Sequence, residues 1–150
     1  MQLDKFTIKA QEAIQRAQQL AGEHQHQAIE MAHLLKAVFD VDEQGFQDRV
    51  IEASKQKPVL VDFWAEWCAP CLSLAPALER VIRELDGAVD LAKVEVDDNM
   101  RLAGHYRLRG FPTVIMFYQG QELGRFSGSR PAPWIRDWID EHAGQSIKPG

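Results

Sequence analysis

Cys68 and Cys71 are the residues of this chain best suited to covalent chemistry. They are the only cysteines among its 150 residues, and they stand three positions apart. On a helix this spacing puts both thiols on one face, close enough to form a small disulfide. A helix N-terminus stabilises a thiolate and lowers a thiol pKa by roughly 1–5 units. The pattern therefore predicts that Cys68 attacks a disulfide and that Cys71 resolves the resulting mixed disulfide.

A structural zinc site and a pair of inert buried thiols are the alternatives for the same two cysteines. A structural zinc ion takes four ligands, and the five histidines are scattered without a closely spaced pair downstream of the cysteines. His26 and His33 have no Asp or Cys at ligand spacing. We therefore expect no metal site, and the tryptophans and the proline around the cysteines favour a reactive pair over an inert one.

The elements beside the cysteines must hold them at a junction between a strand and a helix. Residues 59–65 are apolar and β-branched after Pro58, which is typical of a buried strand. Pro70 suits the first turn of a helix, where its missing N–H is harmless. Asp62 interrupts the apolar strand, and burial would raise the pKa of its carboxyl. Asp62 could then accept a proton from Cys71 during resolution, although an Asp at a partly hydrated position would have no such role.

The sequence Trp-Ala-Glu-Trp-Cys-Ala-Pro-Cys at 64–71 closely resembles the thioredoxin family. Val-Asp-Phe at 61–63 and Phe-Pro-Thr at 111–113 extend the resemblance, which runs from about residue 45 to 144. It implies an α/β thioredoxin fold, in which helices lie on both sides of a mixed central sheet. It also implies a protein-disulfide reductase, a thiol–disulfide oxidoreductase that serves electron transport and cell redox homeostasis. No flavin or nicotinamide motif is present, so we expect no bound cofactor and an external electron donor similar to thioredoxin reductase.

The resemblance assigns further residues to the site. It implies that Asp62 is the internal base and that Lys93 pairs with it across neighbouring strands. The alternative for Lys93 is a surface lysine whose aliphatic part packs on the protein. Pro112 is implied to follow a cis peptide bond beside the cysteines, where the backbone before it can hold an extended substrate. The residues implied to complete a shallow apolar groove for disulfide-bearing chains are Trp67, Phe111 and Gly128.

Residues 1–42 differ in character from the rest of the chain. Apolar residues recur at helical spacing in two stretches, which predicts a helical hairpin too small to form a core alone. The motifs Asp-Lys-Phe-Thr at 4–7 and His-Leu-Leu at 33–35 resemble the N-terminal repeat of Clp ATPases, a carrier of adaptors and substrates. No Walker loop is present, so no ATPase activity is implied. We expect this hairpin to dock on the catalytic domain, away from the groove.

The predicted organisation is a Clp N-terminal-like helical segment at 1–42, a thioredoxin-like domain at 43–144 and a flexible tail at 145–150. Residues 37–41 are ambiguous because five residues carry no usable periodicity. We favour helix through about Phe39, with the first strand of the sheet lost or very short. The other expected helices cover 46–55, 72–85, the residues from an Asn99 cap to Tyr106, and a last apolar face around 134–139. The other expected strands are 91–97, 113–118 and 122–126.

Composition limits the classes of partner. The formal net charge is −5 without a basic cluster, which argues against nucleic acid. The chain has no run of 18 apolar residues and no apolar signal core at its N-terminus, so we expect a cytoplasmic protein with no membrane association. The favoured function is disulfide reduction. The alternative is a redox-linked chaperone or adaptor, whose N-terminal helices bind clients or Clp-type machinery.

Overall fold

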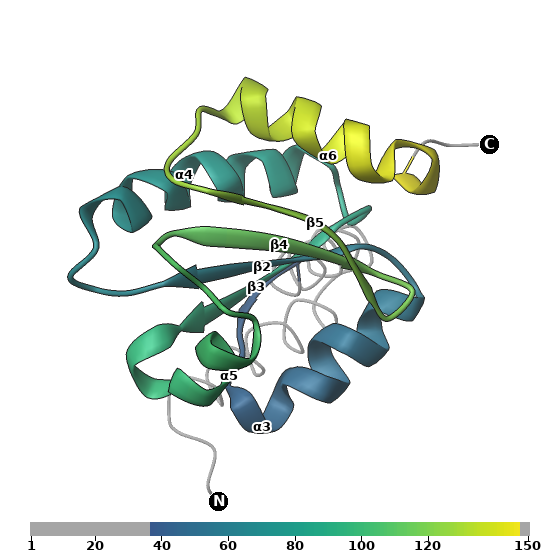
Figure 1. Cartoon of the computed structure of the whole chain (residues 1–150). Coiled ribbons are helices and arrows are strands. Elements are labelled where there is room, and N and C mark those ends of the chain that lie inside the picture. Colours follow the sequence, from purple (N-terminus) through teal and green to yellow (C-terminus); the bar gives the residue numbers. More distant parts are fainter. Residues whose placement is uncertain (1–36, 148–150) are drawn as a thin grey trace, which may run out of the picture. The chain divides into compact units, whose positions relative to one another are not determined.

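The computed structural model describes residues 37–147, which contain one five-stranded sheet in the order β1-β3-β2-β4-β5 (Figure 1). The first three of these strands are parallel to one another, whereas β4 runs antiparallel to β2 and β5 antiparallel to β4. The mixed sheet predicted from the sequence is confirmed. The strands are β1 Val38–Asp40, β2 Val59–Trp64, β3 Asp90–Glu95, β4 Thr113–Tyr118 and β5 Gln121–Ser127.

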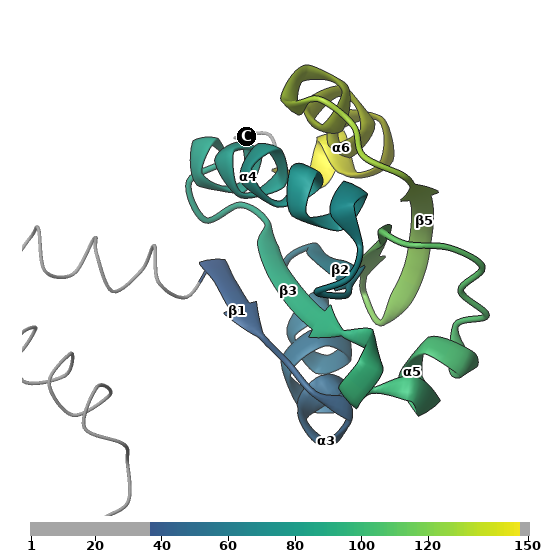
Figure 2. The same cartoon turned by 90° about the vertical axis from the view of Figure 1, so that its left-hand side faces the viewer.

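Helices cover both faces of the sheet. Helices α4 and α6 lie over one face, and α3 and α5 lie over the other (Figures 1 and 2). No helix within residues 37–147 combines the length and the apolar character needed to cross a bilayer. The helical elements are α3 Glu43–Phe46, η1 Gln47–Glu52, η2 Ala53–Lys55, α4 Ala69–Glu84, η3 Val96–Asp98, α5 Met100–His105 and α6 Ala132–Ile147.

Strand β2 is central and supplies both cores because successive side chains point to opposite faces. Leu60 packs in the core beneath α4 and α6, while Val61 and Phe63 pack in the core on the side of α3 and α5. A strand buried on both faces is expected to be almost continuously apolar, as this one is. By the same alternation, the side chain of Asp62 lies on the face that Leu60 occupies, which is the face covered by α4.

The first strand is present, so the helix favoured through Phe39 is wrong. Val38 pairs with Leu91 and Asp40 with Lys93, in parallel with β3. The strand is very short, as anticipated. Its backbone satisfies hydrogen-bonding groups of β3 that would otherwise be unpaired on that side, and this long-range pairing outweighs any local helical preference. The rest of the expected hairpin, residues 1–36, lies outside the described residues.

The predicted Asn99 cap also needs correction. Asn99 stands at the N-cap position of α5 without capping it, because its Oδ1 accepts from the Glu43 N–H at 2.9 Å. Asn99 therefore ties α3 to the start of α5. Helix α6 continues after non-helical backbone at Ala143 to Ile147, past the expected start of the tail at 145. The remainder of that tail, residues 148–150, lies outside the described part of the chain.

Candidate active site

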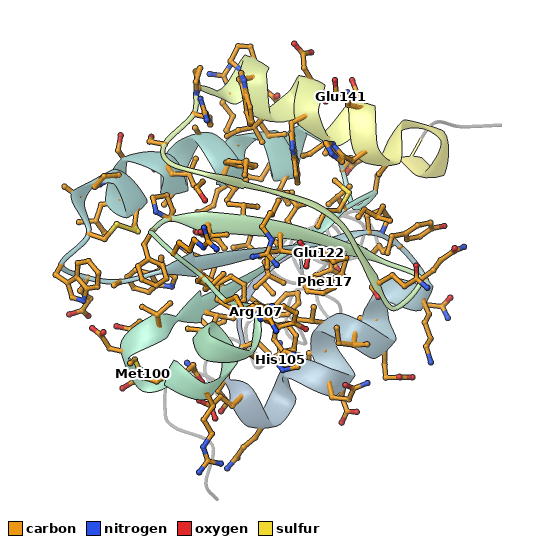
Figure 3. The ribbon with its side chains drawn as sticks, viewed as in Figure 1. Met100, His105, Arg107, Phe117, Glu122 and Glu141 are labelled. Carbon is orange, nitrogen blue, oxygen red and sulfur yellow. A yellow bond between two sulfur atoms is a disulfide. The ribbon has the colours of Figure 1, made fainter. Side chains whose placement is uncertain are left out.

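The two cysteines lie where β2 passes into α4. Cys68 is the N-cap of α4 and has extended backbone, with φ −99° and ψ 100°. Pro70 occupies the first turn, as the sequence predicts. Cys68 and Cys71 form a disulfide with their Cα atoms 5.2 Å apart (Figure 3). The N–H of Cys71 donates a hydrogen bond to Sγ of Cys68 at 3.2 Å.

This placement treats the two sulfur atoms differently. Unpaired N–H groups and the helix dipole at the start of α4 favour a negative charge on Sγ of Cys68. Cys71 lies within the helix, and both cysteines are buried, Cys68 at 4% and Cys71 at 2% exposure. After reduction, the position at the helix start, and not exposure, can therefore make Cys68 the thiolate and leave Cys71 as the thiol beside it.

Asp62 is a buried carboxyl on β2, the strand that leads to the cysteines. It is 1% exposed, and its Oδ1 has no hydrogen-bond partner among residues 37–147. Burial raises the pKa of Asp62 from 3.8 to about 7, while the charge of Lys93 lowers it and the charge of Glu79 raises it. Near neutral pH this carboxyl can therefore both take up and release a proton.

Lys93 is beside Asp62 but does not form the expected ion pair with it. The two residues are in register on β3 and β2. The Lys93 Nζ instead contacts Oε2 of Glu79 on α4 at 3.1 Å. Lys93 and Glu79 both remain partly exposed, so their ion pair keeps contact with water, whereas a pair with Asp62 would require removing the ammonium from water. Sequence reasoning missed Glu79. The strand residue that Glu79 contacts depends on how α4 crosses the sheet, and the sequence alone does not show that crossing.

Glu79 and Lys93 are predicted to shift the pKa of Asp62 in opposite directions. Glu79→Gln removes a nearby negative charge and frees the ammonium, so the pKa should fall below about 7. Lys93→Met removes the positive charge, so the pKa should rise. Carbon-13 NMR titration of the Asp62 carboxyl measures its pKa in both variants. Glu84→Gln is the control, since Glu84 pairs with Arg80 in a separate exposed contact on α4; shifts of one sign in both test variants would contradict this electrostatic account.

Trp67 and Phe111 form part of an open groove next to the disulfide. Trp67 is 65% exposed, and its ring meets that of Phe111 edge-on with centroids 6.0 Å apart. The indole Nε1 donates to Oδ2 of Asp97 at 2.9 Å, which fixes the ring at the surface. Sequence reasoning missed Asp97, which follows an apolar strand and carried no separate signal. The groove has a volume of about 360 Å³ and its other lining residues are Val96, Asp97, Met100, Ala103, Gly104, Arg107 and Leu108.

Pro112 and Gly128 lie together next to this groove. The Phe111–Pro112 peptide bond is cis, as the resemblance implied. The Gly128 N–H donates to the Pro112 carbonyl at 3.0 Å, and Gly128 has φ 89°, a conformation that favours glycine. Phe111 lines the groove, whereas Pro112 and Gly128 are not among its lining residues. The predicted binding residues are therefore neighbours, but only Trp67 and Phe111 share the cavity.

Comparison with known proteins supports both parts of the predicted architecture. The Clp repeat N-terminal domain matches residues 5–61, and the thioredoxin family matches residues 37–141. The two matches overlap at 37–61, which the structure folds into β1, α3, η1, η2 and the start of β2. The N-terminal match therefore reaches into the sheet of the thioredoxin domain.

Thioredoxins are among the characterised proteins that this chain is similar to. The chain is 37% identical over 106 residues to thioredoxin of Chlorobaculum thiosulfatiphilum, covering 71% of this chain and 96% of that protein. It is 41% identical over 106 residues to probable thioredoxin-2 of Caenorhabditis elegans, covering 70% of this chain and 72% of that protein. With the cysteine pair at the start of α4 and the family match over most of its length, this chain belongs to the thioredoxin family of thiol–disulfide oxidoreductases.

Proposed function

We propose that this protein reduces disulfide bonds of other proteins, with Cys68 as the attacking nucleophile and Cys71 as the resolving thiol. The observation that carries this assignment is the position of Cys68 at the N-cap of α4, where the Cys71 N–H reaches its sulfur at 3.2 Å. A thiolate there is stabilised without burial of a separate cation. Cys71, one turn into the helix, is close enough to displace whatever Cys68 has bound.

The reaction proceeds in two exchanges. The Cys68 thiolate attacks one sulfur of the substrate disulfide, that bond breaks, and the leaving substrate thiolate takes up a proton from water. Cys71 then passes its proton to Asp62 and attacks Sγ of Cys68. The bond between Cys68 and the substrate breaks, and the second substrate thiolate leaves and takes up a proton from water. The substrate disulfide has gained two electrons, and the Cys68–Cys71 disulfide remains. A carboxyl whose pKa lies near 7 is suited to this proton transfer.

We propose that an extended segment of the substrate binds across the groove formed by Trp67 and Phe111. The exposed ring of Trp67 and the half-buried ring of Phe111 offer apolar contact without selecting one side chain. Pro112 has no N–H, so the backbone before it remains available for contact with the substrate chain. Gly128 adds no side chain next to Pro112, which keeps the approach to the disulfide open. Such a surface suits flexible segments of many sequences.

Electrons must come from outside the chain. Each cycle leaves the Cys68–Cys71 disulfide, and reuse of the protein requires a donor that returns two electrons. We propose an external reductase protein similar to thioredoxin reductase, acting in the cytoplasm, where thiols are kept reduced. The physiological substrates are then cytoplasmic proteins with accessible disulfides.

Catalytic turnover tests this function. Substoichiometric protein, excess peptide disulfide and dithiothreitol as the donor should give many moles of peptide thiol per mole of protein, above the rate with dithiothreitol alone. A reduction potential of about −270 mV would agree with a reductase, and one of about −180 mV with an isomerase. A single turnover without recycling would instead favour a redox-sensing adaptor.

The Clp-like match supports a second candidate function, in which the N-terminal segment binds clients or Clp-type machinery. Because β1 begins at Val38, deletion of 1–36 leaves the sheet intact. The deletion should keep kcat/KM for a peptide disulfide within about twofold, because every proposed reacting residue lies beyond Pro58. It should lower the thermal midpoint or the solubility, because apolar surface would be exposed.

Affinity for a Clp-type partner should fall on the same deletion, as measured by calorimetry with the full chain as the control. A loss of kcat/KM above about tenfold would contradict the separation of the two functions. Amide hydrogen exchange of the full chain tests the predicted docking of the N-terminal helices. Protection equal to that of a free peptide would contradict the docking.

A further inference from the structure

The groove beside the disulfide continues along α5 and reaches a guanidinium group. Trp67 borders Cys68 at one side, and Met100, 67% exposed, lies at the start of α5. Arg107 follows the end of the same helix and also lines the groove; Figure 3 labels both Met100 and Arg107. The groove therefore offers apolar surface near the reacting sulfurs and a positive charge beyond it.

Two charged side chains line this groove, those of Asp97 and Arg107, and only that of Asp97 already forms a hydrogen bond within the described residues. The Asp97 carboxylate accepts from the Trp67 indole at 2.9 Å. The Arg107 side chain is exposed and makes no hydrogen bond or ion pair within residues 37–147. Its charge is therefore available to a ligand that enters the groove.

The backbone at Arg107 gives a second, independent reason to look for a role. Arg107 has φ 56°, in the left-handed region that favours glycine. Its N–H donates to the Gly104 carbonyl at 3.1 Å and the Leu108 N–H donates to the Ala103 carbonyl at 3.2 Å. These two bonds form a Schellman motif, whose left-handed position is usually glycine. An arginine is less favourable there than a glycine, as are Asp86 and Gln119 at their own positive-φ positions, and a functional use of the Arg107 side chain would account for this cost.

We propose that Arg107 selects protein disulfides that carry an acidic residue about three positions from the reacting cysteine. This inference rests on the proposed function and names the substrate class of the same site. In this proposal the bound segment runs along α5, from Met100 towards Arg107. The six residues of that helix rise about 9 Å, and an extended peptide covers that length in about three residues. An acid adjacent to the cysteine would instead lie near Asp97, whose negative charge disfavours it.

The expected preference for an acidic over a neutral residue in the substrate is modest. An ion pair at this exposed site should raise the second-order rate constant about 2- to 5-fold. Surface ion pairs are screened by salt, so the preference should shrink between about 0.05 M and 0.5 M NaCl.

Peptide dimers joined by one disulfide test the inference on the full-length, pre-reduced protein. Each dimer carries Glu or the neutral control Gln at one, three or five residues from the cysteine, and release of peptide thiol is followed by chromatography after acid quench. The measured quantity is the Glu-to-Gln ratio of rate constants at each position. We expect a ratio of about 2–5 at position three in low salt, and no preference for Glu at position one.

Four variants assign the preference to one side chain. Arg107→Gln and Arg107→Gly should bring the ratio at position three to about 1, and Arg107→Lys should keep part of it. Arg107→Gly should also have a thermal midpoint at or above that of the original protein, since glycine suits φ 56°. Arg109→Gln is the matched control, because Arg109 is an exposed arginine two residues away that does not line the groove, and it should keep the ratio.

Three results would overturn the inference. They are equal rates for Glu and Gln dimers at position three, a ratio that survives Arg107→Gln, and a ratio lost equally in Arg109→Gln. In each case reduction of the Gln dimers would leave the proposed reductase function standing. Failure to reduce any dimer would overturn the proposed function together with this inference.

Discussion

Replacing Cys68 by serine is expected to reduce the rate of disulfide reduction by at least about 1,000-fold, because a hydroxyl at the start of α4 is not a comparable nucleophile. Cys71→Ser should behave differently. Its Cys68 can still attack, but nothing resolves the product, so a mixed disulfide with the substrate should accumulate. Mass spectrometry of the protein after incubation with a peptide disulfide distinguishes the two outcomes.

Ala69→Ser is a control for these substitutions, since it introduces a hydroxyl at an exposed position between the cysteines without removing a thiol. It should retain turnover. A stable mixed disulfide on Cys71 in the Cys68→Ser variant, with none in Cys71→Ser, would reverse the assigned roles.

Asp62→Asn is expected to stabilise the fold at neutral and higher pH. Burial raises the pKa of Asp62 from 3.8 in the unfolded chain to about 7, so the folded state binds this proton more tightly. The contribution to stability is fully present below about pH 3.8 and is lost as the pH rises through about 7. Over that interval the loss amounts to about 4 kcal/mol in the free energy of unfolding, and asparagine does not incur it.

Denaturant unfolding at about pH 5 and pH 8 measures this effect. The gain from Asp62→Asn should be larger at pH 8 than at pH 5 by about 3 kcal/mol. The cost of burying an unpartnered amide lowers the gain equally at both pH values. Asp137→Asn, at an exposed position on α6, should change neither value. A gain that does not depend on pH would contradict the raised pKa of Asp62.

The same substitution is expected to slow the resolving step by about 100-fold near pH 7, because the internal proton acceptor is lost. Stopped-flow measurement of the decay of the mixed disulfide, as a function of pH, tests this. Unchanged kinetics across the pH range would rule out Asp62 as the base.

Local patterns were enough to predict the core of the site. The apolar run of β2, the spacing of the cysteines and Pro70 each act within a few residues, so they indicated the junction between β2 and α4 correctly. The strand from Thr113 to Tyr118 was also confirmed, and a turn at Gln119 and Gly120 joins it to β5. That turn has positive φ at both residues, which matches the hairpin type that glycine favours.

Features that depend on contacts between residues far apart in the chain could not be predicted from the sequence. The strand at Val38–Asp40 exists because β3 pairs with it, and no local periodicity of apolar residues predicts that pairing. Lys93 contacts Glu79 because α4 crosses the sheet above it, whereas register alone suggested Asp62. Asp97 holds Trp67 across 30 positions of the chain, and Asn99 bonds to α3 instead of capping α5.

Competitive alkylation of the reduced protein is the most direct test of the central claim, that the start of α4 makes Cys68 the attacking thiolate. Limiting iodoacetamide at pH 7, followed by peptide mass spectrometry, gives the relative rates at the two cysteines, and repeating it from pH 4 to 10 gives the pKa of each thiol. We predict that Cys68 reacts several-fold faster and has a pKa at least about 1 unit below the usual 8.5. Faster alkylation of Cys71 at neutral pH, or an unshifted pKa at Cys68, would contradict it.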